Sequence, residues 1–245
     1  MRKFKIKKII SYLLTLLLSL NLAVPYVGAF CSETHEYTTK MGMNLFKNNF
    51  KENFCQIYDK EAQKQLMVFC TRPDEDECTG GFKYHFYNPA TEKNFMGENK
   101  SALKKCNDHY SNALKYYKDG KKLDAFEELG RSLHFLEDLN TPVHTNNQTF
   151  IDTAFNVAFH VSFENRCKEI QDNVVASMCK REFAYYKNNS ITTIAKASAL
   201  LANDNFYALY EKFLDKNLVA VNSITNAQKA VAGVLYKFTL DVALA

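Results

Sequence analysis

The sequence predicts an all-α protein built as a single helical bundle domain, and three observations lead to that fold class. The 245-residue chain contains only 8 Gly and 4 Pro, so it lacks the frequent turn signals of a strand-rich sandwich or barrel. Its 47% hydrophobic residues suffice for one sizeable core. No internal repeat or linker divides it. We therefore predict one domain over residues 30–245, preceded by a separate segment at residues 1–29.

The first half of this domain is predicted to contain a helix and an irregular region. Residues 34–54 have helical character because Tyr37, Met41, Leu45 and Phe46 fall on one stripe. Residues 70–99 form the least regular part of the chain, with an acidic run at 74–77, a glycine pair at 80–81 and two prolines.

The second half is predicted to be helical with few breaks. A helix over residues 101–118 begins at a plausible Ser101 cap and ends at Asp119-Gly120. Residues 123–139 are strongly helical, and Pro142 ends that helix. We expect one further helix over residues 153–187. An Ala-rich helical tail follows at 191–245, with one break near Asn217.

Residues 1–29 are typical of an export signal. Five basic residues and no acidic one accompany an apolar run from residue 9 to about 22, followed by Pro25 and Gly28-Ala29. We predict cleavage after Ala29, which makes Phe30 the mature N-terminus and sends the protein to the periplasm or out of the cell. An uncleaved anchor stays open, although the run is short for one, as does a lipoprotein attached at Cys31.

The charge balance excludes a strongly basic surface on the predicted mature chain. The whole sequence carries a net charge of +4, and the signal supplies five of its 31 Lys and Arg residues. Beyond residue 29, 26 basic residues stand against 27 acidic ones. This balance provides no excess of positive charge for binding a polyanion such as a nucleic acid.

Seven cysteines lie beyond the signal, which in an exported protein indicates up to three disulfides and one remaining thiol. Cys70 and Cys78 bracket a short polar loop that a disulfide could close. Cys167 and Cys179 could join two helical segments. The sequence leaves the pairing open. No Cys-x-x-Cys pair occurs, so a thiolate zinc site is not expected.

Histidines and carboxylates recur at a spacing that suits metal binding. His134 and Asp138 are four residues apart on a predicted helix, so both side chains leave the same face. His160 and Glu164 repeat this spacing, and His144 follows the Pro142 break. Imidazole nitrogens and carboxylate oxygens are donors suited to zinc. Further donors are supplied from the irregular region and the mature N-terminus by Asp74, His85, His35 and the amine and carbonyl of Phe30.

A run of residues containing three of these donors resembles the signature of the bacterial zinc-dependent phospholipases C. It reads His134-Phe-Leu-Glu-Asp138-Leu-Asn-Thr-Pro142-Val-His144-Thr-Asn-Asn147. The resemblance extends to four other segments, in the same order as in the family, and covers roughly residues 30–190. These segments are 30–35, 73–74, 85–89 and 160–164.

The resemblance implies a helical bundle that holds three zinc ions at the bottom of a cleft. Carried over by residue, the first ion would be bound by Asp74, His85, His134 and Asp138, and the second by His144, His160 and Glu164. The third would be bound by Phe30 and His35, with Asp138 as a bridge. The implied reaction is hydrolysis of the glycerol-side phosphoester of a phospholipid by a metal-activated water. Asp74 would orient or deprotonate that water, or serve as a ligand alone.

The resemblance also indicates a partner and a headgroup site. The expected substrate is phospholipid at a membrane surface, with phosphatidylcholine as the candidate lipid, and the expected state is a monomer. Glu33 and Phe82 match positions where the family contacts a cationic headgroup, a contact that a carboxylate and an aromatic face would suit. Glu75 stands where relatives carry a third, aromatic residue.

Two departures and two alternatives accompany this interpretation. The family has Trp at the mature N-terminus where this chain has Phe30, and Glu137 occupies a position where a small residue is usual. The related zinc-dependent single-strand nucleases are one alternative, since the short spacing from Phe30 to His35 resembles their start. Glu164 argues against them because their final ligand pair generally ends in Asp. A non-catalytic, zinc-stabilised binding protein is the other alternative.

Overall fold

The computed structural model describes residues 31–76, 82–146, 154–210 and 215–243, and most of them are helical. No β-strand occurs in these ranges, where one isolated bridge joins Asn88 and Lys93. The predicted all-α class is therefore confirmed. The elements, in chain order, are α2 (Ser32–Asn49), α3 (Lys51–Ile57), α4 (Lys60–Phe69), α5 (Arg72–Asp76), η1 (Phe82–His85), α6 (Ala102–Lys118), α7 (Lys122–Asp138), η2 (Pro142–His144), α8 (Ala154–Ile170), η3 (Gln171–Asn173), α9 (Lys180–Asn188), α10 (Ile191–Tyr210) and α11 (Lys216–Ala243).

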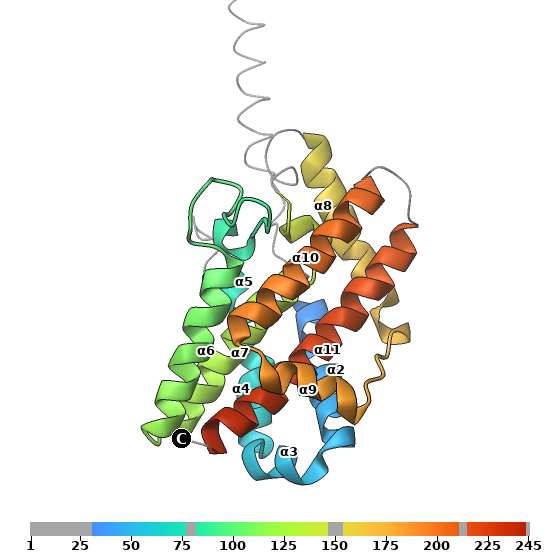
Figure 1. Ribbon diagram of the computed structural model, residues 1–245. Helices are drawn as coiled ribbons and strands as arrows, with labels where there is room; N and C mark the ends of the chain where they lie inside the picture. Colours follow the sequence, from blue (N-terminus) through green and yellow to red (C-terminus); the bar gives the residue numbers. More distant parts are fainter. Residues whose placement is uncertain (1–30, 77–81, 147–153, 211–214, 244–245) are drawn as a thin grey trace, which may run out of the picture.

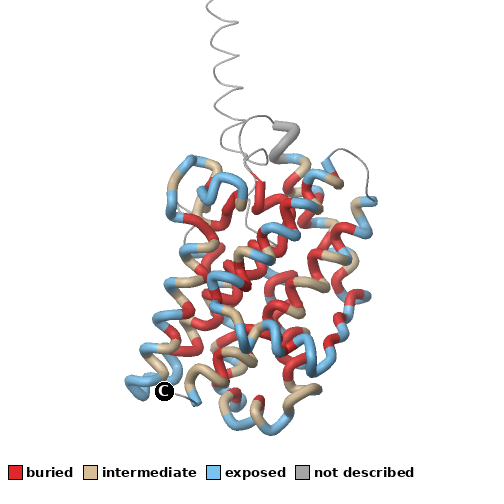
Figure 2. Tube along the Cα trace, in the orientation of Figure 1, coloured by how far each residue is buried: buried red, intermediate tan, exposed pale blue. Residues whose placement is uncertain are grey.

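The helices pack side by side around α11. This helix contacts α2 along its length and also touches α8, α9 and α10, while α7 packs between α4 and α6 (Figure 1). The buried faces of the helices turn toward one another inside the bundle (Figure 2). α2 and α11 approach each other closely at Gly42 of α2, where an added Cβ would overlap the side chain of Val231 on α11. No helix in the described part of the chain is both long and apolar enough to cross a bilayer.

The predicted helix over 34–54 is two helices, and the helix after it was not predicted. Phe50 interrupts the first two with a non-helical backbone, at φ −142° and ψ 62°. α4 then begins behind Asp59, whose carboxylate accepts a hydrogen bond from the Ala62 N–H at 2.9 Å. The breaks at Asp119-Gly120 and before Pro142 are confirmed, and Gly120 adopts a positive φ of 77°.

The predicted single helix over 153–187 is wrong in its middle. α8 ends at Ile170, and the backbone of residues 174–179 is not helical before α9 begins. The buried side chain of Gln228 on α11 replaces the missing helical hydrogen bonds. Its amide donates to the Val174 carbonyl at 2.9 Å and accepts from the Ala176 N–H at 2.8 Å. The predicted break near Asn217 agrees with the start of α11 at Lys216.

The six cysteines within the described ranges are free thiols. The predicted bond between Cys167 and Cys179 is not formed, because Cys167 is buried in the core while Cys179 is exposed ahead of α9. The predicted pair of Cys70 with Cys78 is not tested, since Cys78 lies outside the described residues. The proposed signal at 1–29 and Phe30 lie outside them as well.

Candidate metal centre

Eight of the nine predicted metal ligands lie in the described part of the chain, and all eight are buried. None exposes more than 6% of its surface. They come from six elements: α2, α5, η1, α7, η2 and α8. Their nitrogen and oxygen atoms form three groups, and within each group the ligand atoms lie within 4.8 Å of one another. The groups are His35 with Asp74 and His134, His85 with His134 and Asp138, and His144 with His160 and Glu164.

The first predicted set is assembled around Asp138. One of its oxygens, Oδ2, lies 2.9 Å from His85 Nδ1 and 3.5 Å from His134 Nε2. The two imidazole nitrogens are 3.0 Å apart. Asp74 completes the set from α5, with Oδ1 3.6 Å from His134 Nε2 and 3.9 Å from His85 Nδ1. The i,i+4 spacing on α7 places His134 and Asp138 on one face, as the sequence indicated.

The second carboxylate oxygen of Asp138 faces a different histidine. Its Oδ1 lies 3.7 Å from His35 Nε2, and the His35 ring stacks on the His134 ring with centroids 4.0 Å apart. The two oxygens of Asp138 therefore face the histidines of two predicted sets. This is the geometry that a bridging carboxylate requires.

The remaining predicted set lies between η2 and α8. Glu164 Oε1 is 2.7 Å from His160 Nε2 and 3.2 Å from His144 Nε2. The i,i+4 spacing on α8 brings the first of these pairs together, and the turn after Pro142 supplies His144. Phe86 stacks on the His144 ring at 4.6 Å and covers one side of the group.

Backbone carbonyls orient two of the imidazoles. His134 Nδ1 lies 2.8 Å from the Cys70 carbonyl, and His144 Nδ1 lies 3.0 Å from the His85 carbonyl. A carbonyl only accepts, so each Nδ1 carries the proton and each Nε2 keeps its lone pair toward the group. Metal-binding histidines in proteins are commonly fixed in this way.

Burial sets the protonation of the groups in a direction that suits metal binding. It lowers the pKa of His35 and His134 well below the usual value, and lowers the pKa of His144 to about 4. Neutral imidazole is the form that ligates a metal. Burial also raises the pKa of Glu164, since an isolated buried carboxylate is costly unless a cation offsets its charge. These nitrogen and oxygen donors fit zinc.

The two predicted headgroup residues lie outside the buried groups. Glu33, on the first turn of α2, is exposed, and its carboxylate accepts a hydrogen bond from the Lys168 ammonium at 2.6 Å. This contact lowers the pKa of Glu33. Phe82 is half-buried in η1 and stacks on Phe95 with centroids 5.9 Å apart. Glu75 is exposed and forms an ion pair with Arg72.

One buried residue beside the groups has no assigned role in the sequence analysis. Glu137 is fully buried, with Oε2 2.5 Å from His35 Nδ1 and Oε1 accepting a hydrogen bond from the Thr39 hydroxyl at 2.8 Å. Burial raises its pKa well above the usual value. Its position directly before Asp138, a predicted metal ligand on the same helix, was the available signal. The sequence alone indicated only a departure from the family.

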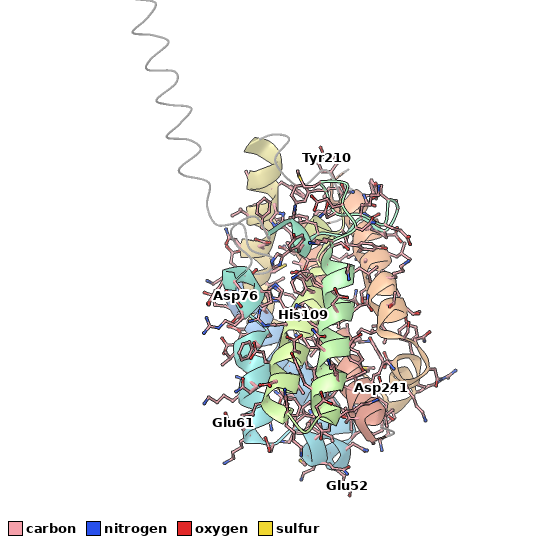
Figure 3. The ribbon with its side chains drawn as sticks, turned by 90° about the vertical axis from the view of Figure 1, so that its left-hand side faces the viewer. Glu52, Glu61, Asp76, His109, Tyr210 and Asp241 are labelled. Atoms are coloured by element: carbon pink, nitrogen blue, oxygen red, sulfur yellow. The ribbon has the colours of Figure 1, made fainter. Side chains whose placement is uncertain are left out.

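The sixth histidine does not join the groups. His109 of α6 has Nδ1 2.8 Å from Glu128 Oε2 on α7, and its ring stacks on Phe135. Figure 3 shows His109 on the face of the bundle turned toward the viewer, with Asp76, two residues beyond Asp74, at the left-hand edge.

Comparison with known proteins assigns the chain to a family. The sequence model described as zinc dependent phospholipase C matches residues 34–232. The chain belongs to the zinc-dependent phospholipase C family. The resemblance seen in the sequence is thereby confirmed.

Individual relatives agree with this assignment. The chain is 25% identical over 240 residues to a phospholipase C of Clostridium perfringens, covering 85% of this chain and 59% of that protein. It is 35% identical over 92 residues to a phospholipase C of Bacillus cereus, covering 38% of this chain and 32% of the relative. The alpha toxin from Clostridium absonum shares the fold, with a TM-score of 0.75 at 23% identity over 86% of this chain and 64% of the toxin. The chain thus spans less than two thirds of these relatives.

Proposed function

We propose that this protein is a zinc-dependent phospholipase C, a phosphoric diester hydrolase that cleaves the glycerol-side phosphoester of phospholipids. The observation that carries the proposal is the burial of eight nitrogen- and oxygen-bearing ligands, drawn from six elements, in three groups small enough to hold a metal ion. Membership of the family supports zinc as the metal and phospholipid as the substrate class.

The proposed ligand sets are those that the resemblance implies, and the distances within the first two sets support them. Three zinc ions are proposed, one held by Asp74, His85, His134 and Asp138, one by His144, His160 and Glu164, and one by His35 and the amine and carbonyl of Phe30 with Asp138 as the bridge. Zinc ions supply two things when bound: a lower pKa for a coordinated water and positive charge to offset that of the reacting phosphoryl group.

The side chains of the chain position the reaction. Asp74 is the proposed catalytic residue because Oδ1 lies within 4 Å of two different histidine nitrogens, at the edge of the first set. It comes from the five-residue helix α5, which contacts α4 and α7. A carboxylate there can accept the proton of the attacking water while the other ligands stay fixed.

Headgroup recognition is proposed at Glu33 and Phe82, with phosphatidylcholine as the substrate. A choline group would approach a carboxylate that Lys168 already contacts, so the ammonium of Lys168 competes with the headgroup for Glu33. The protein is further proposed to act as a monomer at a membrane surface, after export to the periplasm or the medium and cleavage behind Ala29.

The test compares two substrates on protein prepared with Phe30 as its first residue. Release of phosphocholine from phosphatidylcholine vesicles and of nucleotides from single-stranded DNA is measured in parallel, each with and without a chelator. Chelator-sensitive release of phosphocholine, with the DNA intact, is the expected result. Release of nucleotides alone would replace the proposal by the nuclease alternative, and zinc binding without either reaction would replace it by the binding-protein alternative.

A further inference from the structure

The contacts of Glu137 point to a role at the metal centre, and this inference rests on the proposed zinc site. Glu137 lies between two proposed ligands of the first set on α7, His134 and Asp138, yet its carboxylate faces α2 instead of their group. Its two oxygens contact His35 Nδ1 at 2.5 Å and the Thr39 hydroxyl at 2.8 Å. All four residues that meet here, including Asp138, are fully buried. A buried carboxylate is costly unless donors match its oxygens. The burial of Glu137 therefore depends on its contacts with His35 and Thr39.

We propose that Glu137 is a positioning residue, which fixes the orientation and the tautomer of His35 so that Nε2 is the metal-binding nitrogen. His35 Nε2 is the ring atom on the side of Asp138, 3.7 Å from Oδ1. A neutral imidazole that ligates through Nε2 must carry its proton on Nδ1. That N–H then points at Glu137, whose carboxylate accepts the hydrogen bond.

The other imidazoles show why this arrangement matters. His134 and His144 obtain the same tautomer from backbone carbonyls, which are set by the fold and cannot be removed by a side-chain substitution. His35 obtains it from a side chain. Glu137 also joins α7 to α2, which carries His35, and therefore holds the histidine that is proposed to share a zinc ion with Phe30. A carboxylate that accepts from a ligating histidine orients the ring and raises its basicity.

The experiment is a zinc titration of the metal-free protein against a chromophoric competitor, repeated with cobalt, whose visible absorption reports the coordination. Glu137→Ala should weaken one site by about 10- to 100-fold and leave the others within about twofold of wild type. Glu137→Gln should restore most of the affinity, because its amide oxygen can still accept the N–H of His35. The matched control is Glu128→Ala, which removes a carboxylate from the same helix that contacts His109 Nδ1 at 2.8 Å but no proposed ligand.

Several results would overturn the proposal. Wild-type zinc isotherms for Glu137→Ala would refute the role, and so would an equal loss of zinc affinity in Glu128→Ala. Should circular dichroism show that Glu137→Ala is unfolded, Glu137→Asp and Glu137→Gln decide. The shorter Asp withdraws its carboxylate from His35 and should weaken the same site more than Gln does; the reverse order overturns the role.

The outcomes also separate this role from the proposed function. Wild-type protein that binds zinc but hydrolyses no phospholipid would defeat the proposed function and leave the role of Glu137 standing. A Glu137→Ala protein with wild-type zinc affinities would defeat the role, whatever the hydrolysis assay shows.

Discussion

Removal of zinc should lower the melting temperature of this protein. Substitution of a zinc ligand should reduce this zinc-dependent shift in proportion to the number of sites that the ligand serves. Asp138 directs one oxygen at His85 and His134 and the other at His35, so it serves two proposed sites. Within the described part of the chain, Glu164 contacts His144 and His160, which belong to a single proposed site. A ligand that binds only the folded state at 100 times its Kd adds about 2.7 kcal/mol per site. For a chain of this size that corresponds to roughly 5–11 °C per site.

The assay measures the melting temperature of each variant with zinc and again with chelator, and compares the differences. Because the packing cost of a substitution affects both measurements, it cancels in the difference. Glu164→Ala should lose about one site's share of the zinc-dependent shift, and Asp138→Ala about two. Equal losses in the two variants would refute the bridging role of Asp138. A wild-type melting temperature that zinc does not change would refute the metal centre.

Four further predictions test other parts of the structure. Asp74→Asn should abolish hydrolysis and keep most of the bound zinc, measured by turnover and metal analysis; undiminished turnover would remove its catalytic role. An extra residue before Phe30 should cripple the third zinc site, and the same metal content and activity with and without it would exclude the N-terminal ligand. In metal-free protein the unfolded chain protonates His144 near pH 6.5 and the folded chain only near pH 4. The unfolded state therefore binds more protons in that window, and the contribution of His144 to the free energy of unfolding falls by roughly 3 kcal/mol as the pH drops through it. Urea titrations should show this slope in wild type and a smaller one in His144→Gln, and parallel profiles would contradict it. Gly42→Ala should destabilise the fold by about 1–3 kcal/mol, because the new methyl overlaps Val231; an unchanged urea midpoint would show that α2 and α11 can separate without cost.

The fold class and the ligand spacing could be predicted because both depend on local sequence. The i,i+4 pairs on α7 and α8 place their own side chains on one face, whatever the rest of the chain does. Gly120 and Pro142 act through their own backbone restrictions. These features need no knowledge of the tertiary structure.

The errors arise where a distant residue decides the local structure. The backbone at 174–176 leaves the helical conformation because Gln228, more than fifty residues away, bonds to it. The stripe assigned to the first helix is displaced as well. Tyr37 and Met41 are only half-buried, while Thr38 and Thr39 are buried, and Thr39 donates to Glu137 on another helix. Apolar periodicity cannot identify a polar buried face.

The same reason explains what was missed at the site. His35 is far from Glu137 and Asp138 in the sequence, and the packing of α2 against α7 brings one nitrogen of its ring to each of these two carboxylates. The paired carboxylate of Glu33 is a second example, since Lys168 reaches it from α8. Spacing identifies residues that act from one helix, whereas contacts between helices require the structure.

The most direct test of the metal centre is a crystal structure of the zinc-loaded protein with diffraction data collected on both sides of the zinc absorption edge. The predicted result is three anomalous peaks, each adjoining one proposed set: the first beside His85 and His134, the second beside His144 and His160, and the third beside His35. Peaks elsewhere, or none among these residues, would contradict the assignment of this buried cluster as the zinc site.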